Sequence, residues 1–120
     1  MLNLPPSVRI WLCAQPVDLR KSFDSLAEVV RTSLGGDPLS GHLFVFRNKS
    51  GDRLKLLYWD EDGYVIVYKR LEAGAFRFPQ GTANTHSISI RAADLLLLLD
   101  GVDLASVKRS RRYRRTATPV

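Results

Sequence analysis

The sequence feature that most constrains the fold is a block of three strand-like runs joined by two short polar loops. The runs cover residues 42–47, 53–59 and 64–70, and they are rich in aromatic, β-branched and leucine side chains. The loop at 48–51 reads NKSG and the loop at 60–63 reads DEDG. Polar stretches that end in glycine are typical of β-hairpin connections. The block therefore predicts an antiparallel meander of at least three strands.

Two stretches outside the meander predict helices. The first follows a short buried strand at residues 9–14, with Asp18 as the expected N-cap, and it ends at Gly35 and Gly36. The second covers residues 91–99 and is stopped by a glycine two positions later. The apolar side chains of the first helix recur at helical spacing and form one stripe: Leu19, Phe23, Leu26, Ala27, Val30 and Leu34.

Two further short runs, residues 76–78 and 87–90, are candidate strands at the margins of the meander. Elements of this kind, with strands grouped together and few helices, are typical of α+β domains. We therefore expect an antiparallel β-meander of three to five strands, packed on one face by two helices. The length suits a single domain at residues 1–104, followed by a basic tail at 105–120 that we expect to be disordered.

Strand pairing divides the meander into two chemically different faces, provided that both hairpin loops have an even number of residues. One face is aliphatic and should pack under the helices: Leu43, Val45, Leu54, Leu56, Val65 and Val67. The other face is aromatic and basic: His42, Phe44, Phe46, Arg53, Lys55, Leu57, Trp59, Tyr64, Ile66, Tyr68 and Arg70.

The aromatic face has two interpretations. It resembles a platform on which bases stack beside cationic side chains. Alternatively, a helix, a loop or another subunit covers the aromatic rings while the long basic side chains reach solvent at the margin. We favour the covered interpretation, because aromatic residues are common on sheet faces. The candidate stacking or partner residues are Phe44, Phe46, Trp59, Tyr64 and Tyr68.

The net charge of +6 is concentrated at one end of the chain. Residues 1–107 contain 12 basic and 12 acidic side chains, so the whole excess lies in the tail. Such a cluster neutralises phosphates and releases their counterions, which makes DNA the expected partner. Basic residues around the first hairpin should assist. The candidate nucleic-acid-binding residues are Lys108, Arg109, Arg111, Arg112, Arg114, Arg115, Arg47, Lys49, Arg53 and Lys55.

Other classes of function find little support. No nucleophile elbow, phosphate loop or zinc pattern is present, and the carboxylates at 60–62 are typical of a solvated turn. His42 and His86 lack neighbours at ligand spacing, and Cys13 lies in an apolar strand. We therefore expect no metal, no cofactor, no small-molecule substrate and no enzymatic activity. Without a signal peptide or an apolar run long enough to span a bilayer, the protein is expected in the cytoplasm, away from membranes.

Beyond these physical arguments, a long central block resembles a known family. Residues 37–79, DPLSGHLFVFRNKSGDRLKLLYWDEDGYVIVYKRLEAGAFRFP, are similar to the signature of the TnpB accessory proteins of bacterial IS66-type insertion sequences. Residues 16–26 resemble the family's DMRKGFDGL segment, with Leu19 in place of Met and with Ser22 and Ser25 at the glycine positions. Residues 95–103 resemble its LLEGID helix end. The resemblance extends from about residue 9 to 103.

The resemblance implies an accessory protein of transposition, encoded beside a separate transposase that carries the acidic catalytic triad. The expected partners are DNA and that transposase. The alternative is a pure protein–protein adaptor, in which the aromatic face docks the transposase and the tail is incidental. A small nuclease is the third interpretation, but phosphoryl transfer needs converging carboxylates, and the sequence offers no convincing set.

Overall fold

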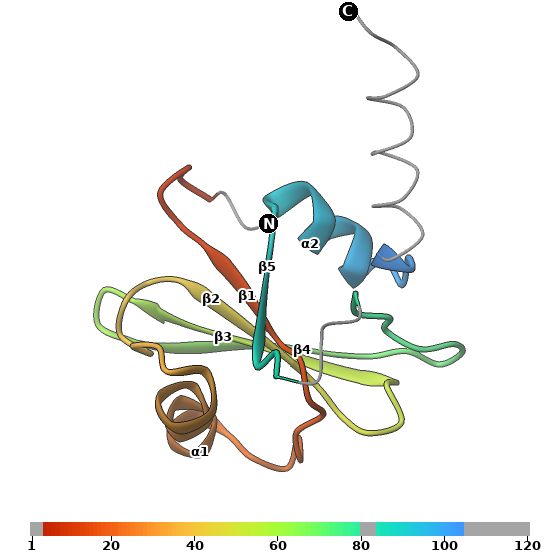
Figure 1. Cartoon of the computed structure of the whole chain (residues 1–120), viewed down its shortest axis with the longest axis horizontal. Coiled ribbons are helices and arrows are strands. Elements are labelled where there is room, and N and C mark those ends of the chain that lie inside the picture. The colour runs from red at the N-terminus through yellow and green to blue at the C-terminus, as the bar shows by residue number, and fades with distance from the viewer. Residues whose placement is uncertain (1–3, 80–83, 105–120) are drawn as a thin grey trace, which may run out of the picture.

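The computed structural model describes residues 4–79 and 84–104, which form one five-stranded sheet flanked by two helical segments (Figure 1). No helix in these two ranges is long and apolar enough to cross a membrane. The basic tail lies outside the described residues. The elements in chain order are β1 Ile10–Cys13, α1 Phe23–Val29, the π-helix η1 Val30–Leu34, β2 Leu43–Arg47, β3 Arg53–Asp60, β4 Gly63–Arg70, β5 Ser87–Ile90 and α2 Ala92–Leu99.

The sheet has the strand order β4-β3-β2-β1-β5, and it confirms the predicted α+β class. The meander β2-β3-β4 is antiparallel as expected, and β5 is antiparallel to β1. The expectation of a purely antiparallel sheet is wrong at one place, because β1 and β2 are parallel. The connection between them contains α1 and η1, and a crossover of this length returns the chain to the same end of the sheet.

Residues 76–78 form no strand, although Phe76 and Phe78 are both buried. The Phe76 backbone N–H donates to the carbonyl of Gly51, at 2.7 Å, so this segment packs beside the first hairpin. Its aromatic side chains belong to the core on the α2 side of the sheet. The apolar pattern that suggested a strand therefore reflects burial of the two rings.

The register confirms the predicted alternation of faces. Arg47 pairs with Leu54, and Asp60 pairs with Gly63, so both hairpin loops have an even number of residues. Two core clusters follow from this, one on each face. The buried members of the first are Ile10, Leu12, Leu43, Val45, Leu54, Leu56, Phe76, Phe78, Ile90, Leu95, Leu98, Leu99 and Leu104. The buried members of the second are Cys13, Leu19, Leu26, Ala27, Val30, Phe44, Phe46 and Leu57.

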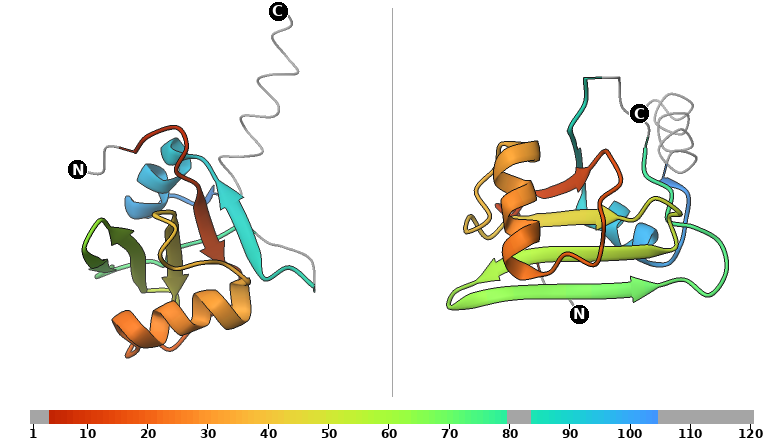
Figure 2. Two further views of the ribbon diagram at one scale, coloured as in Figure 1. Left: turned by 90° about the vertical axis from the view of Figure 1, so that its left-hand side faces the viewer. Right: turned by 90° about the horizontal axis from the view of Figure 1, so that it is seen from below.

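The two helices lie on opposite faces of the sheet, which corrects the expectation that both pack on one face (Figures 1 and 2). Helix α2 covers the aliphatic face, and Lys69 of β4 donates to the Leu99 carbonyl at its C-terminal end. Segment α1–η1 covers the aromatic face. Both faces carry large apolar side chains, so each needs its own cover to exclude water. The cover of the aromatic face is partial, because Phe44 and Phe46 are buried beneath α1 whereas Tyr68 is 48% exposed.

Helix α1 begins later than its apolar stripe suggested. Ser22 is the N-cap, and Asp18 belongs to a preceding turn in which its carbonyl accepts from Lys21 N–H. Leu19 is buried from this loop, but Phe23 is 45% exposed and does not belong to the core. Figure 2 shows the first turn of α1 on the β3–β4 side of the sheet, near its edge. The C-terminal end is as predicted, with Gly35 at φ 65° after η1.

Candidate nucleic-acid interface

An open groove of about 1160 Å³ lies at one end of the sheet, on the face that α1 covers. Three segments that are distant in the sequence form it: the loop before α1, the β2–β3 hairpin, and the end of β4. Its lining residues are Pro16, Val17, Asp18, Leu19, Arg20, Asn48, Lys49, Ser50, Arg53, Lys55 and Tyr68. The lining contains four cationic side chains and one carboxylate, so its charge is positive although residues 1–107 are neutral overall.

The β2–β3 hairpin owes its shape to a network of local hydrogen bonds. The Asn48 amide donates to Ser50 Oγ at 3.1 Å and to Asp52 Oδ1 at 2.8 Å, and it accepts from Arg53 N–H at 3.0 Å. The Ser50 hydroxyl also donates to Asp52 Oδ1, at 2.9 Å. These bonds from Asn48 and Ser50 lower the pKa of Asp52. The network holds Lys49 at the tip of the hairpin, exposed to solvent.

Gly51 allows this hairpin to close. Its φ of +79° lies in the left-handed region, and a Cβ at this position would lie 3.3 Å from the Cβ of Ala75. Its N–H donates to the Asn48 carbonyl, and its own carbonyl accepts from Phe76 N–H. Gly51 therefore allows both the backbone conformation of the turn and the close packing of the turn against Ala75.

Two opposed residues form the floor of the groove, Lys55 on β3 and Tyr68 on β4. The Lys55 side chain lies over the Tyr68 ring, with Nζ 4.8 Å from the ring centroid, and Nζ donates to the Lys21 carbonyl at 2.7 Å. Arg53 Nη1 donates to the Tyr68 hydroxyl at 2.8 Å. Lys55 is only 8% exposed, whereas Tyr68 is 48% exposed. Tyr68 thus presents an aromatic surface held between two cations.

The loop before α1 forms the opposite wall. Val17 N–H donates to the Arg47 carbonyl at 2.9 Å, which ties the loop to the end of β2. Arg20 makes a bidentate ion pair with Asp18, in which Nη2 and Oδ2 are 2.7 Å apart. The hydrogen bonds from Arg20 lower the pKa of Asp18 to about 2. Sequence reasoning missed Arg20, although it lies in the segment at 16–26 that resembles the family motif.

The structure brings together four of the predicted site residues, Lys49, Arg53, Lys55 and Tyr68. Arg47 lies outside the groove lining. Its guanidinium lies 4.7 Å from the centroid of the Phe78 ring, and its Nε is buried without a hydrogen-bond partner among the described residues. Burial lowers the pKa of Arg47. Arg47 therefore contributes to the groove through its backbone carbonyl.

The other aromatic candidates do not share the groove with Tyr68. Phe44 and Phe46 are buried beneath α1 and offer no open ring surface. Trp59 and Tyr64 pair edge to face, with ring centroids 5.1 Å apart, next to the acidic tip of the β3–β4 hairpin. The predicted aromatic face is therefore divided, and only Tyr68 presents its ring beside cations. The tail residues Lys108 to Arg115 lie outside the described residues.

The described residues contain no group of three His, Cys, Asp or Glu side chains that could hold a metal ion. The carboxylates at 60–62 lie at the exposed tip of the β3–β4 hairpin, far along β3 from the groove. Cys13 is buried, and its burial raises the pKa of the thiol. Among the described residues, the candidate site is thus a group of positive charges beside the exposed Tyr68.

These features describe a small α+β protein with a basic groove, and comparison with known proteins gives its family. The model of the family described as IS66 Orf2 like protein matches residues 8–109, so the chain belongs to that family. The chain is 36% identical over 116 residues to the uncharacterized protein y4jC of Sinorhizobium fredii, covering 97% of both chains. It is 41% identical over 103 residues to the uncharacterized protein y4hO of the same organism, covering 86% of this chain and 88% of the relative.

No solved structure matches the fold at a significant level. Family membership confirms the resemblance found from the central block and implies an accessory protein of insertion-sequence transposition.

Proposed function

We propose that the protein assists transposition by contacting the DNA backbone through the basic groove, together with its basic tail. The observation that carries this proposal is the clustering of Arg20, Lys49, Arg53 and Lys55 around one groove of an otherwise neutral body. Phosphate contacts from Lys and Arg supply affinity without reading sequence. Such contacts would place the protein on the DNA of the element, where the separate transposase acts.

The geometry of the groove favours a strand of phosphates over a single anion. Lys49 lies at the tip of one hairpin and Arg20 on the opposite wall, so cations line both sides of an open channel. Arg20 is already paired with Asp18, whereas no ion pair within residues 4–79 and 84–104 involves Lys49 or Arg53. Tyr68 adds a ring on which an unpaired base stacks. The groove thus has the parts of a backbone-binding channel with one stacking position.

The alternative is a protein–protein adaptor of the transposase. An adaptor that docks through the whole aromatic face is not supported, because α1 buries Phe44 and Phe46. An adaptor would have to use the part of that face that stays open around Tyr68, or other surface such as the exposed Phe23 at the start of α1. DNA contact through the groove therefore has the stronger support from the described residues.

The proposal is tested by the salt dependence of DNA binding. Each phosphate contact contributes about −0.9 to the slope of log affinity against log salt on duplex DNA. The Lys49→Gln/Arg53→Gln variant should reduce the slope by about 2, and truncation after Ala105 should reduce it by up to about 5. Arg9→Gln/Arg77→Gln is the matched control, because it also removes two exposed positive charges, from residues that do not line the groove.

The groove variant should bind more weakly than the control to all duplex sequences, and its loss should add to that of the truncation. Unchanged affinity and slope in the groove variant would remove the groove from the proposal and leave the tail alone. If the wild-type protein binds the transposase but shows no binding to DNA even at low salt, the adaptor interpretation replaces the proposal.

We also expect that the protein does not nick, cut or join DNA with magnesium or manganese. The catalytic step would then belong to the transposase. Cleavage by the purified protein that disappears in an Asp60→Ala/Asp62→Ala variant would contradict this part of the proposal.

A further inference from the structure

The two edges of the sheet are protected to very different degrees. At one edge, β5 has only four residues and is followed at once by Arg91. A short edge strand has few unpaired backbone groups with which another chain could form hydrogen bonds. At the other edge, β4 has eight residues, and its centre from Tyr64 to Tyr68 carries no charge, no proline and no glycine. Among residues 4–79 and 84–104, β4 pairs on one side only. Such an edge is a template for strand addition.

The register shows which backbone groups of β4 face this open edge. Leu71 N–H donates to the Asp52 carbonyl at 2.7 Å, which continues the β3–β4 ladder. In an antiparallel ladder, successive residues point their N–H and C=O groups alternately toward and away from the partner strand. Val65, Val67 and Lys69 therefore bond toward β3. The backbone groups of Tyr64, Ile66 and Tyr68 point outward and are available to a further strand.

The charge pattern along β4 is self-complementary. Its N-terminal end begins at the acidic tip with Glu61 and Asp62. Its C-terminal end carries Lys69, which donates to the Leu99 carbonyl, and the exposed Arg70, which also contacts Glu72 at 2.9 Å. Between them lie only apolar and aromatic side chains. A second β4 placed antiparallel brings the acidic end of each copy to the basic end of the other. A parallel partner would instead align like charges.

We propose that two copies of this chain pair through β4, antiparallel about a two-fold axis at Ile66. In this register, Ile66 lies opposite its own copy, Tyr64 opposite Tyr68, and Asp62 opposite Arg70. Tyr64, Ile66, Tyr68 and Arg70 are positions of β4 whose backbone groups point outward, whereas Asp62 in the hairpin turn offers its side chain, since its N–H already donates to the Asp60 carbonyl. The hydrogen-bond pattern and the charge pairing therefore fit the same register. The two sheets then form one continuous ten-stranded sheet.

Pairing through β4 also fixes how the two DNA-binding grooves are arranged. A two-fold axis perpendicular to the joined sheet keeps α1 of both copies on the same face, and the grooves open on that face. The dimer would thus present both basic grooves on one side. The pairing does not depend on the proposed function, because it rests on β4 alone.

Two measurements on the full-length protein test the pairing. The first is the oligomeric state by sedimentation equilibrium, with Asp62→Arg, Arg70→Asp and the double variant that swaps both charges. Both side chains are exposed, so folding should survive in all three variants. Each single reversal should weaken the dimer on the order of tenfold, since it creates two repulsive pairs, and the double swap should restore it.

The second measurement is amide hydrogen exchange followed by NMR at several protein concentrations. Pairing through β4 predicts that the amides of Tyr64, Ile66 and Tyr68 become protected as concentration rises, while those of Val65 and Val67 are protected throughout. This alternation distinguishes a β4 dimer from one formed by any other surface.

Three outcomes would overturn the proposal. The first is a wild-type monomer at all accessible concentrations. The second is a dimer whose strength is unchanged from wild type in both single charge reversals. The third is protection of Tyr64, Ile66 and Tyr68 amides that is independent of concentration, which would mean that another segment of this chain covers the edge. Loss of dimerisation with DNA binding intact would leave the proposed function standing, so the two failures are distinguishable.

Discussion

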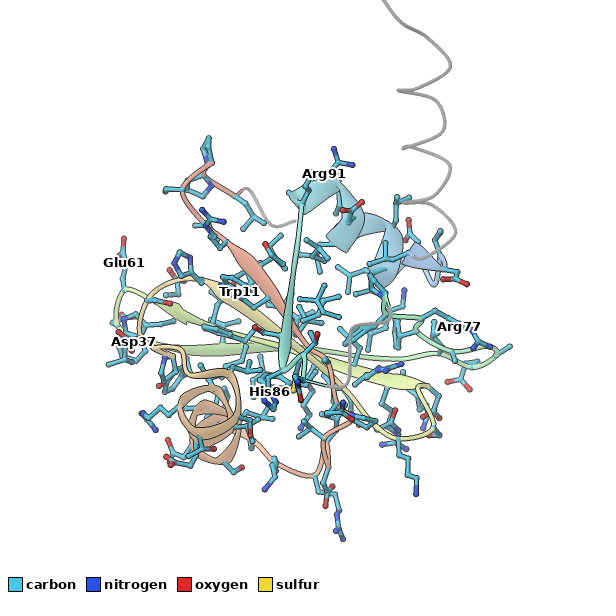
Figure 3. The ribbon with its side chains drawn as sticks, viewed as in Figure 1. Trp11, Asp37, Glu61, Arg77, His86 and Arg91 are labelled. Atoms are coloured by element: carbon cyan, nitrogen blue, oxygen red, sulfur yellow. The ribbon has the colours of Figure 1, made fainter. Side chains whose placement is uncertain are left out.

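The two hairpins at the ends of β3 have loops of the same kind, polar residues that end in a glycine, but their charges are of opposite sign. Both connect antiparallel strands through polar residues and a glycine, yet the β2–β3 hairpin lies in a basic groove and the β3–β4 hairpin ends in carboxylates. In Figure 3, Asp37 and Glu61 lie toward one end of the molecule and Arg77 toward the other. Within residues 1–107 the charges cancel in the sum but not in space.

The two hairpins also differ in construction. The β2–β3 loop is held by the side chains of Asn48, Ser50 and Asp52 and is packed against the segment at 75–76. The β3–β4 loop has only Glu61 and Asp62 between paired residues, with exposed side chains. Hydrogen bonds and packing therefore hold the cations of the basic end at defined positions. The acidic end is a short turn exposed to solvent.

The largest expected effect concerns the floor beneath the basic end. Phe46 on β2 is fully buried opposite Lys55, and Phe46→Ala should lower the free energy of unfolding by ~3–5 kcal/mol. Phe23→Ala is the matched control on α1 and should cost less than about 1 kcal/mol, because Phe23 is exposed. Chemical denaturation of both variants checks this. Equal losses would show that the assignment of the α1 face is wrong.

A smaller effect should separate the two hairpin glycines. Gly51→Ala places a Cβ at positive φ and against Ala75, and should destabilise the protein by ~1–3 kcal/mol. Gly63 has no positive φ, and a Cβ there would meet no other atom within 4 Å, so Gly63→Ala should change stability by less than about 1 kcal/mol in either direction. Thermal unfolding of the two variants measures this difference in stability. Equal destabilisation by Gly63→Ala and Gly51→Ala would show that the two glycines do not differ as the structure indicates.

Local patterns in the sequence were sufficient for the meander and its faces. The alternation of side chains and the even hairpin loops predicted which residues of β2, β3 and β4 share a face, and the register agrees. The same patterns placed Lys49, Arg53 and Lys55 near one another, because hairpin neighbours are close by construction. The family resemblance found in residues 37–79 was likewise a property of this contiguous block.

Features that depend on distant segments were not predictable in this way. The parallel pairing of β1 with β2 follows from the path of the crossover, and no local pattern encodes it. The start of α1 was misplaced because Leu19 and Phe23 fit the helical spacing, while the Asp18–Arg20 ion pair stabilises a turn there. Arg20 joins the groove only through that fold of the loop, so composition and spacing gave no reason to select it.

The smallest expected effect is a pH dependence of the β2–β3 hairpin. Hydrogen bonds from Asn48 and Ser50 lower the pKa of Asp52 from 3.8, so the stabilisation is present above that value and is lost as pH falls through the lowered pKa. Asp52→Asn should therefore be less stable than wild type at neutral pH, and the gap should close below about pH 4. Ser50→Ala removes one of the two hydrogen bonds to Asp52, so it should lose part of this pH-dependent stabilisation. A gap that persists undiminished as the pH falls well below the ordinary pKa of an aspartate would contradict the network.

The most direct test of the central claim is an NMR titration of the full-length protein with a short DNA duplex. If the groove contacts the backbone, amide shifts should change at Lys49, Arg53 and Tyr68 as well as in the tail, and the changes should shrink with added salt. The amides of Asp60 and Glu61 should shift least. Changes confined to residues after 105, with the groove amides unmoved at saturation, would contradict the claim that the structured domain binds DNA.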